Sequence, residues 1–208
     1  MEELIKDPFS LIIIGVAGQG NVMTSFLVCN AMVNQGYKVT FSQTYPAQQR
    51  GGSVINYIRI SRDIQASPII PEGRADVIVG MEPMEAMRML NQYGNPEVTS
   101  IVNPRAIHPM DTTGQGVKYP ELDKLLDDIK ALSARTWIVP ASTEARKLGN
   151  PIIANVILTG VLAGTGLLPL DRGTMTQVLQ ERFPKALDIN IKAFDKGVEL
   201  AEHAAASK

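Results

Sequence analysis

Two kinds of hydrophobic pattern alternate along the first two thirds of the chain. Residues 10–14 form a continuous aliphatic run of strand length. Residues 21–35 then have helical spacing that ends at Gly36, with apolar positions at Val22, Phe26, Cys29 and Val33. Because a glycine-rich turn joins the two segments, the pattern predicts a strand, a tight turn and a helix in succession.

The same alternation continues to residue 139 and then stops. Further strand patterns cover residues 37–41, 53–60, 76–80, 100–103 and 136–139. Helical patterns cover residues 83–92 and 121–134 between them, and later residues 143–148, 151–164, 171–182 and 188–205. Asp171 and Asp188 are predicted N-caps of the last two helices.

This order of elements predicts an α/β fold, a three-layer Rossmann-like sandwich with a mostly parallel sheet and a helical C-terminal third. We expect one domain over residues 1–208, with a sheet-forming part at about 8–140 and a helical part at about 141–205. Ligands of such sheets bind beyond the carboxyl ends of the strands. The Gly15–Gly20 turn and the Gln43–Gly52 loop both follow strands, so we expect them at one edge of the sheet.

The turn after the first strand reads Gly15-Val-Ala-Gly18-Gln19-Gly20 and predicts an anion pocket, because glycines let backbone amides approach a phosphate at a helix start. The alternative is that the glycines only allow helix and strand to pack closely. The order differs from the dinucleotide fingerprint, and no acid stands at residues 41–43 to bind a ribose hydroxyl. The pattern therefore disfavours ordinary NAD binding, and no Walker lysine follows the turn.

A second candidate motif is Gln49-Arg50-Gly51-Gly52-Ser53. Arg50 offers a planar cation beside a backbone that can approach a phosphate or carboxylate closely. The alternative is a simple hairpin entry into the strand at 53–60. No Asp or Glu stands between Asp7 and Asp63, although the formal net charge of the whole chain is only −1. This span fits an anionic ligand or an acidic partner surface, or it is acid-free only because its first strand and helix are buried.

The composition of the chain excludes several classes of protein and of site. With 208 residues, 45% hydrophobic and 20% charged, the chain is typical of globular proteins, and 5% aromatic residues are few for a nucleic-acid binder. No stretch reaches the roughly twenty apolar residues that span a bilayer, and the N-terminus lacks a signal peptide, so we expect no membrane role and a cytoplasmic location. The single Cys29 excludes a disulfide or an iron–sulfur site made by this chain alone, and it is expected in the core.

We find no catalytic residue and no metal-ligand set in the sequence. His108 lies in a loop and His203 near the C-terminus, each isolated. Glu82 follows the strand at 76–80 and could touch a ligand or partner, but a carboxylate there is more typical of a helix start.

Read together, residues 14–20, 45–53 and 54–61 resemble the gamma component of the 2-oxoacid:ferredoxin oxidoreductases. Gln49 before Arg-Gly-Gly-Ser is similar to the separate small (beta) subunit of the indolepyruvate-type enzymes, and the segment at 154–160 also resembles this family. The resemblance covers most of the chain, and the two N-terminal motifs carry nearly all of its specificity.

The resemblance implies a subunit of a complex that oxidatively decarboxylates a 2-oxoacid to an acyl-CoA. Thiamine diphosphate, Mg and 4Fe-4S clusters are then expected on partner subunits, with ferredoxin or a nicotinamide as electron acceptor. This chain would supply a coenzyme A site, a subunit interface, or both. The residues expected there are Gly15, Gly18, Gln19, Gly20, Tyr45, Arg50, Gly51, Gly52 and Ser53.

Two other functions stay open at this point. One is a free-standing flavin or nicotinamide oxidoreductase with an unusual glycine turn, and the other is a purely structural assembly subunit. An aryl 2-oxoacid such as indolepyruvate or phenylglyoxylate is the first expectation for the substrate, although substrate choice belongs largely to the other subunits.

Overall fold

A computed structural model describes residues 4–44, 52–107 and 118–205. Six strands form one sheet in the order β2-β3-β1-β4-β5-β6. Their bounds are β1 Phe9–Val16, β2 Lys38–Thr44, β3 Ser53–Ser61, β4 Val77–Gly80, β5 Thr99–Val102 and β6 Arg135–Ile138. The helices are α1 Asn21–Asn34, α2 Pro83–Tyr93, α3 Leu122–Ala131, α4 Ala141–Lys147, α5 Ala154–Gly164, α6 Arg172–Arg182 and α7 Leu187–Ala205, with a short 3₁₀ turn, η1, at Pro151–Ile153.

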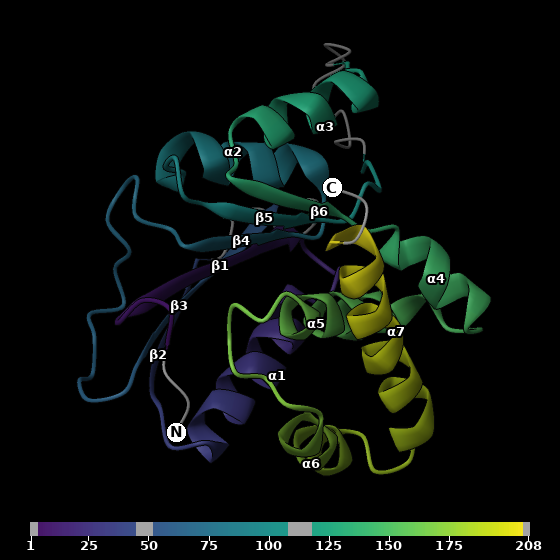
Figure 1. Ribbon diagram of the computed structural model, residues 1–208. Coiled ribbons are helices and arrows are strands. Elements are labelled where there is room, and N and C mark those ends of the chain that lie inside the picture. Colours follow the sequence, from purple (N-terminus) through teal and green to yellow (C-terminus); the bar gives the residue numbers. More distant parts are fainter. Residues whose placement is uncertain (1–3, 45–51, 108–117, 206–208) are drawn as a thin grey trace.

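The helices cover the sheet on both faces, as Figure 1 shows: α2 and α3 lie on one side, and α1 with α5, α6 and α7 lies on the other. β1 is central, and its residues Leu11 to Ile14 are fully buried because both faces of the strand are covered. The predicted three-layer α/β fold is therefore confirmed, and the C-terminal third is helical.

The sheet is mixed. β1, β4, β5 and β6 run parallel, whereas β3 is antiparallel to both β1 and β2. The connection between β2 and β3 is short, and a parallel crossover needs a dozen residues or more, so these two strands form a hairpin. The entry into the strand at 53–60 is thus part of a hairpin, which leaves a ligand-binding role of Arg50 open, and the end of β2 lies at the same edge as the end of β1.

Hydrophobic residues form one core on each face of the sheet. The core on the α1 face joins Leu11 and Ile13 of β1 to residues of α1, α5, α6 and α7, including Val161 and Phe194. The core on the α2 face contains Ile12 and Ile14. The predicted cap Asp171 accepts a hydrogen bond from the amide of Thr174 at 2.9 Å, but α7 begins at Leu187, so Asp188 lies in its first turn rather than at its cap.

Most of the apolar residues whose spacing predicted helix α1 lie on its outer, exposed face. Val22, Phe26 and Val33 are exposed, whereas Leu27 and Met32 are buried against the sheet and helices. Both faces of α1 are apolar, so the periodicity identified the helix without identifying its buried face. Cys29 is partly buried, and burial raises the pKa of its thiol to about 12, in agreement with a packing role.

No helix in the described part of the chain has the length and hydropathy needed to cross a membrane.

Candidate functional site

The glycine turn between β1 and α1 has the backbone that an anion site needs. Gly18 and Gly20 have φ angles of 95° and 85°, which favour glycine because a Cβ atom is strained there. Gly20 is the N-cap of α1, so no side chain caps the helix, and no acidic residue stands in its first turn. The first amides of α1 therefore remain available for an anion at the positive end of the helix dipole.

Two of the glycines also allow close packing around the turn. A Cβ atom on Gly20 would lie 2.8 Å from Nδ2 of Asn155, and one on Gly15 would lie 2.7 Å from Cβ of Met81. Distances this short do not occur between real side chains, so a larger residue at either position would displace its neighbours. The turn therefore combines close packing with backbone amides that are available to an anion. The anion-pocket interpretation and the packing interpretation of the motif are compatible.

The Gln19 side chain stabilises this turn through two hydrogen bonds. Its Oε1 accepts a hydrogen bond from the amide of Val16 at 2.7 Å, and its Nε2 donates to the carbonyl of Met81 at 3.1 Å. The side-chain amide thereby joins the end of β1 to the end of β4. Gln19 lines the pocket beside the turn, but its polar atoms are already engaged in the fold.

The second motif meets the first through its backbone. The amide of Ala17 donates to the carbonyl of Gly52 at 3.0 Å, and Ser53 pairs with Val16 across the strands. The Ser53 hydroxyl accepts a hydrogen bond from Nη1 of Arg88 in α2 at 3.3 Å. Tyr45, Arg50 and Gly51 lie outside the described residues, so their role stays a prediction.

A cavity of about 360 Å³ opens beside the turn, at the carboxyl edge of the sheet. Its walls come from the glycine turn, the ends of β4 and β5, α4, η1 and α5: Ala17–Gly20, Met81, Asn103, Arg105, Ile107, Ser142, Pro151, Ile152, Ala154 and Leu158. The volume suits part of a small ligand or cofactor.

The cation of this cavity, Arg105, was not predicted from the sequence. Arg105 lines the cavity, is exposed, and makes no hydrogen bond or ion pair with any other described residue. Two residues before Arg105, the Asn103 side chain donates to the carbonyl of Met81 at 3.1 Å and to Oγ of Ser142 at 2.9 Å. The signal was present, since Asn103 and Arg105 follow a buried strand and strand ends at this edge meet.

Glu82 is a structural residue of the same edge. It is 1% exposed, and its carboxylate accepts hydrogen bonds from the amides of Glu85 at 2.9 Å and Ile107 at 3.3 Å and from the Tyr119 hydroxyl. Burial raises the pKa of Tyr119, and the hydrogen bond to Glu82 raises it further. The helix-start interpretation of Glu82 is therefore correct, and the residue also holds the segment that carries Arg105.

His203 does not line this cavity. His203 is exposed on α7, with Nδ1 2.7 Å from the carbonyl of Glu199. His108 lies outside the described residues. In the described part of the chain no three His, Cys, Asp or Glu side chains lie close enough to hold a metal ion.

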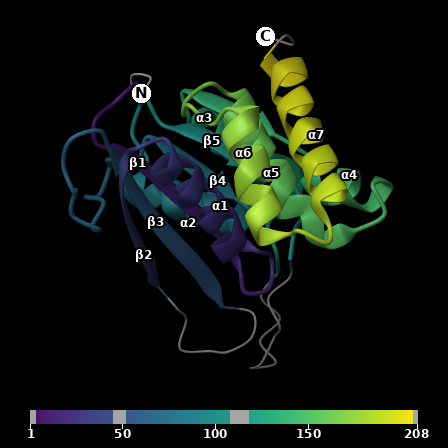
Figure 2. The same cartoon turned by 90° about the horizontal axis from the view of Figure 1, so that it is seen from below.

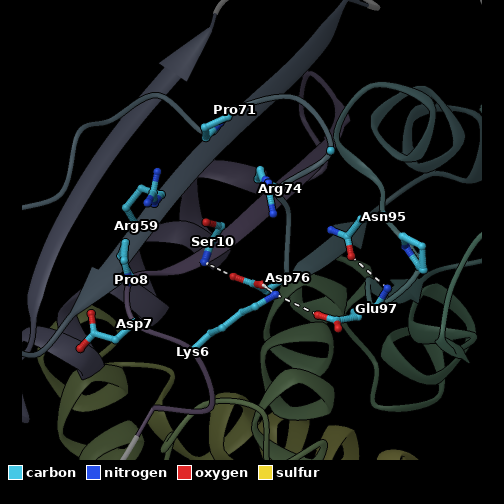
Figure 3. A pocket seen from close by; sticks show the side chains of 12 residues that line it. Lys6, Asp7, Pro8, Ser10, Arg59, Pro71, Arg74, Asp76, Asn95 and Glu97 are labelled. Atoms are coloured by element: carbon cyan, nitrogen blue, oxygen red, sulfur yellow. Dashed lines mark hydrogen bonds and ion pairs between the residues drawn. The ribbon is translucent and has the colours of Figure 1, made fainter.

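A second and larger cavity, of about 550 Å³, lies at the opposite, amino edge of the sheet. Figure 3 shows its network: Asp76 accepts from the amide of Ser10 at 2.7 Å and pairs with Lys6 at 3.0 Å, and Lys6 also bonds Glu97 at 3.1 Å. The carboxylates of Asp76 and Glu97 thus have cationic partners within the fold. Because the cavity is remote from both glycine motifs, we take the carboxyl edge as the candidate site.

Comparison with known proteins shows the family of the chain. Residues 10–200 match the family described as pyruvate ferredoxin/flavodoxin oxidoreductase. The chain belongs to this family. It is 35% identical over 193 residues to the indolepyruvate oxidoreductase subunit IorB of Archaeoglobus fulgidus, covering 92% of this chain and 94% of that subunit. The resemblance carried by the two N-terminal motifs is confirmed.

Other members of the family contain the same unit within a longer chain. Ketoisovalerate oxidoreductase subunit VorA of Methanothermobacter thermautotrophicus is 26% identical over 91% of this chain, which covers only 35% of VorA. A 2-oxoglutarate:ferredoxin oxidoreductase from Magnetococcus marinus, solved with 2-oxoglutarate, coenzyme A and succinyl-CoA bound, has a TM-score of 0.72 at 20% identity over 95% of this chain and 32% of that one. The separate pyruvate oxidoreductase subunit PORC from Thermotoga maritima has a TM-score of 0.66 at 19% identity, over 93% of this chain and 97% of PORC. The relatives are subunits of oxidoreductase complexes, and the structures share this fold.

Proposed function

We propose that this chain is the small, gamma-type subunit of a complex that oxidatively decarboxylates a 2-oxoacid, and that its carboxyl-edge cavity binds coenzyme A. We further propose that the whole chain acts as one cytoplasmic domain. The family and the IorB relatives support the first part. An aryl 2-oxoacid such as indolepyruvate is the substrate class that those relatives favour.

The observation that carries the coenzyme A assignment is a glycine turn into an uncapped helix beside an arginine that has no partner among the described residues. Gly18 to Gly20, which lead into α1, and Arg105 line one cavity, where the turn amides and the guanidinium can bind phosphate oxygens. Leu158, Pro151 and Ile152 form an apolar wall beside them, suited to the pantetheine arm. The motif residues Arg50 and Gly51 are proposed to complete the site from the hairpin.

In this proposal the chain positions the thiol of coenzyme A and leaves the redox chemistry to its partners. On partner subunits, thiamine diphosphate would supply the chemistry that releases carbon dioxide, and iron–sulfur clusters would take up the two electrons of the oxidation. The coenzyme A sulfur would receive the acyl group as its thiol proton is lost. Residues of this chain bind and orient coenzyme A. The hydrogen bonds of Gln19 to Val16 and Met81, and of Glu82 to Ile107, keep the cavity walls in place.

Purification of the native chain from its own cells tests the complex. We expect it to co-purify with larger subunits that carry thiamine diphosphate and iron, both measurable by mass spectrometry and elemental analysis. Recovery of the chain alone, as a homo-oligomer with stoichiometric flavin or nicotinamide, would contradict the proposal and support a free-standing oxidoreductase.

A further inference from the structure

The outward face of α1 is an apolar surface in an unusual position. Val22, Phe26 and Val33 are 47%, 43% and 53% exposed. Phe41 of β2 is 44% exposed and lies on the same face of the sheet, because side chains two residues apart in a strand share a face and Val39 packs on the α1-face core. We call these four residues the α1 surface; Figure 2 shows α1 and β2 on the face of the molecule nearest the viewer.

The sequence of α1 explains why this surface is exceptional. None of its 14 residues is charged, whereas a helix at a protein–water boundary normally has a charged or polar outer face. The outer face of α1 has valine and phenylalanine where such charges are expected, and neighbouring exposed apolar residues mark interaction sites. The α1 surface therefore has the character of a contact that this chain makes with another protein.

Charge around the surface restricts what can cover it. The guanidinium of Arg182 lies 5.2 Å from the centre of the Phe26 ring and has no carboxylate partner among the described residues. No Asp or Glu stands between residues 7 and 63, a span that includes all of α1 and β2. A partner with an apolar surface and a carboxylate facing Arg182 would therefore not be repelled by any acidic side chain from this span.

The position of the surface identifies which partner this is. Gly20, the N-cap of α1, lines the proposed coenzyme A cavity, and Val22 lies in the first turn of the helix. Ile152, 79% exposed, extends the apolar area on the opposite wall of that cavity. A protein seated on α1 therefore lies next to the cavity, which is where an acyl donor must come.

The relatives support a permanent partner. This chain covers 35% of VorA, so the same unit occurs there joined to further protein, whereas a separate subunit must be held by noncovalent contact. We propose that the α1 surface is the docking site for the thiamine-binding subunit of the complex, through an apolar contact with a carboxylate at Arg182. This inference rests on the proposed function.

The test uses Phe26→Asp and Val33→Asp in the full chain, with Leu132→Asp as the matched control. Leu132 is 47% exposed but lies after α3, on the opposite face of the sheet. We expect the two α1 variants to weaken co-assembly with the thiamine-binding subunit about tenfold or more, since a buried carboxylate disrupts an apolar contact. The control should assemble normally, and all three should keep the melting temperature of the parent chain.

Three possible results of this test would contradict the docking inference or the proposed function. Unchanged assembly of both α1 variants would overturn the inference. A parent chain that self-associates, with α1 variants that are monomeric yet assemble normally, would assign the surface to a second copy and also overturn it. If the parent chain recruits no thiamine-binding subunit, the proposed function itself fails, and this is seen before any variant is made.

Discussion

Replacing Gly197 with alanine is expected to lower the free energy of unfolding by about 3 kcal/mol, the upper part of the range for overpacked sites. A Cβ atom on Gly197 would lie 2.0 Å from the carbonyl oxygen of Ile157, and one on Gly160 would lie 2.1 Å from that of Phe194. Backbone atoms of α5 and α7 meet at this crossing, so the helices must separate to admit a methyl group. The separation reaches the cavity, because α5 forms its apolar wall.

Thermal and urea unfolding of the purified chain measure this effect. Gly173→Ala is the matched control: it lies in α6, its Cβ would be 3.1 Å from a carboxylate oxygen of Asp171 and would meet no backbone atom, and alanine favours a helix. The control should be neutral or slightly stabilising. A Gly197→Ala chain that unfolds like the parent would show that α5 and α7 are not packed as closely as described.

Replacing Arg105 with alanine is expected to raise the KM of the assembled complex for coenzyme A about tenfold or more. A hydrogen bond to a charged group contributes about 1.5–3 kcal/mol, and 1.4 kcal/mol is a factor of ten. The turnover number at saturating coenzyme A should change little, because Arg105 is proposed to bind the ligand and not to take part in bond cleavage.

Arg74→Ala is the control for this experiment. Arg74 is also an exposed arginine with no ion-pair partner among the described residues, but it lines the cavity at the opposite edge of the sheet. Removing it changes the net charge by the same amount and should leave the KM unchanged. Equal effects of the two variants would indicate general electrostatic attraction, and no effect of Arg105→Ala would remove this residue from the site.

The sequence predicted the parts of the fold that depend on local pattern. A fully buried strand such as β1 is continuously apolar, and glycines with positive φ mark the turn after it, so both could be predicted from the residues alone. The buried face of α1 could not, because both faces of the helix are apolar and only tertiary packing decides between them.

The site was predicted less completely, for a physical reason. The glycine motif identifies itself through its backbone requirements, but Arg105 and Asn103 belong to the cavity only because β5 lies two strands from β1 at the same edge. Likewise, Gln19 looked like a ligand contact in sequence, and its engagement with Val16 and Met81 depends on strand order. Contacts between distant segments require the topology and cannot be inferred from spacing.

Hydrogen exchange of the assembled complex, with and without coenzyme A, tests whether the carboxyl edge of this chain binds the coenzyme. We expect slower exchange of the amides at the start of α1 and in residues 105–107 when coenzyme A binds, with no change around Asp76 and Glu97 at the other edge. Unchanged exchange at the glycine turn, in a complex that uses coenzyme A for turnover, would contradict it and place the coenzyme on another subunit.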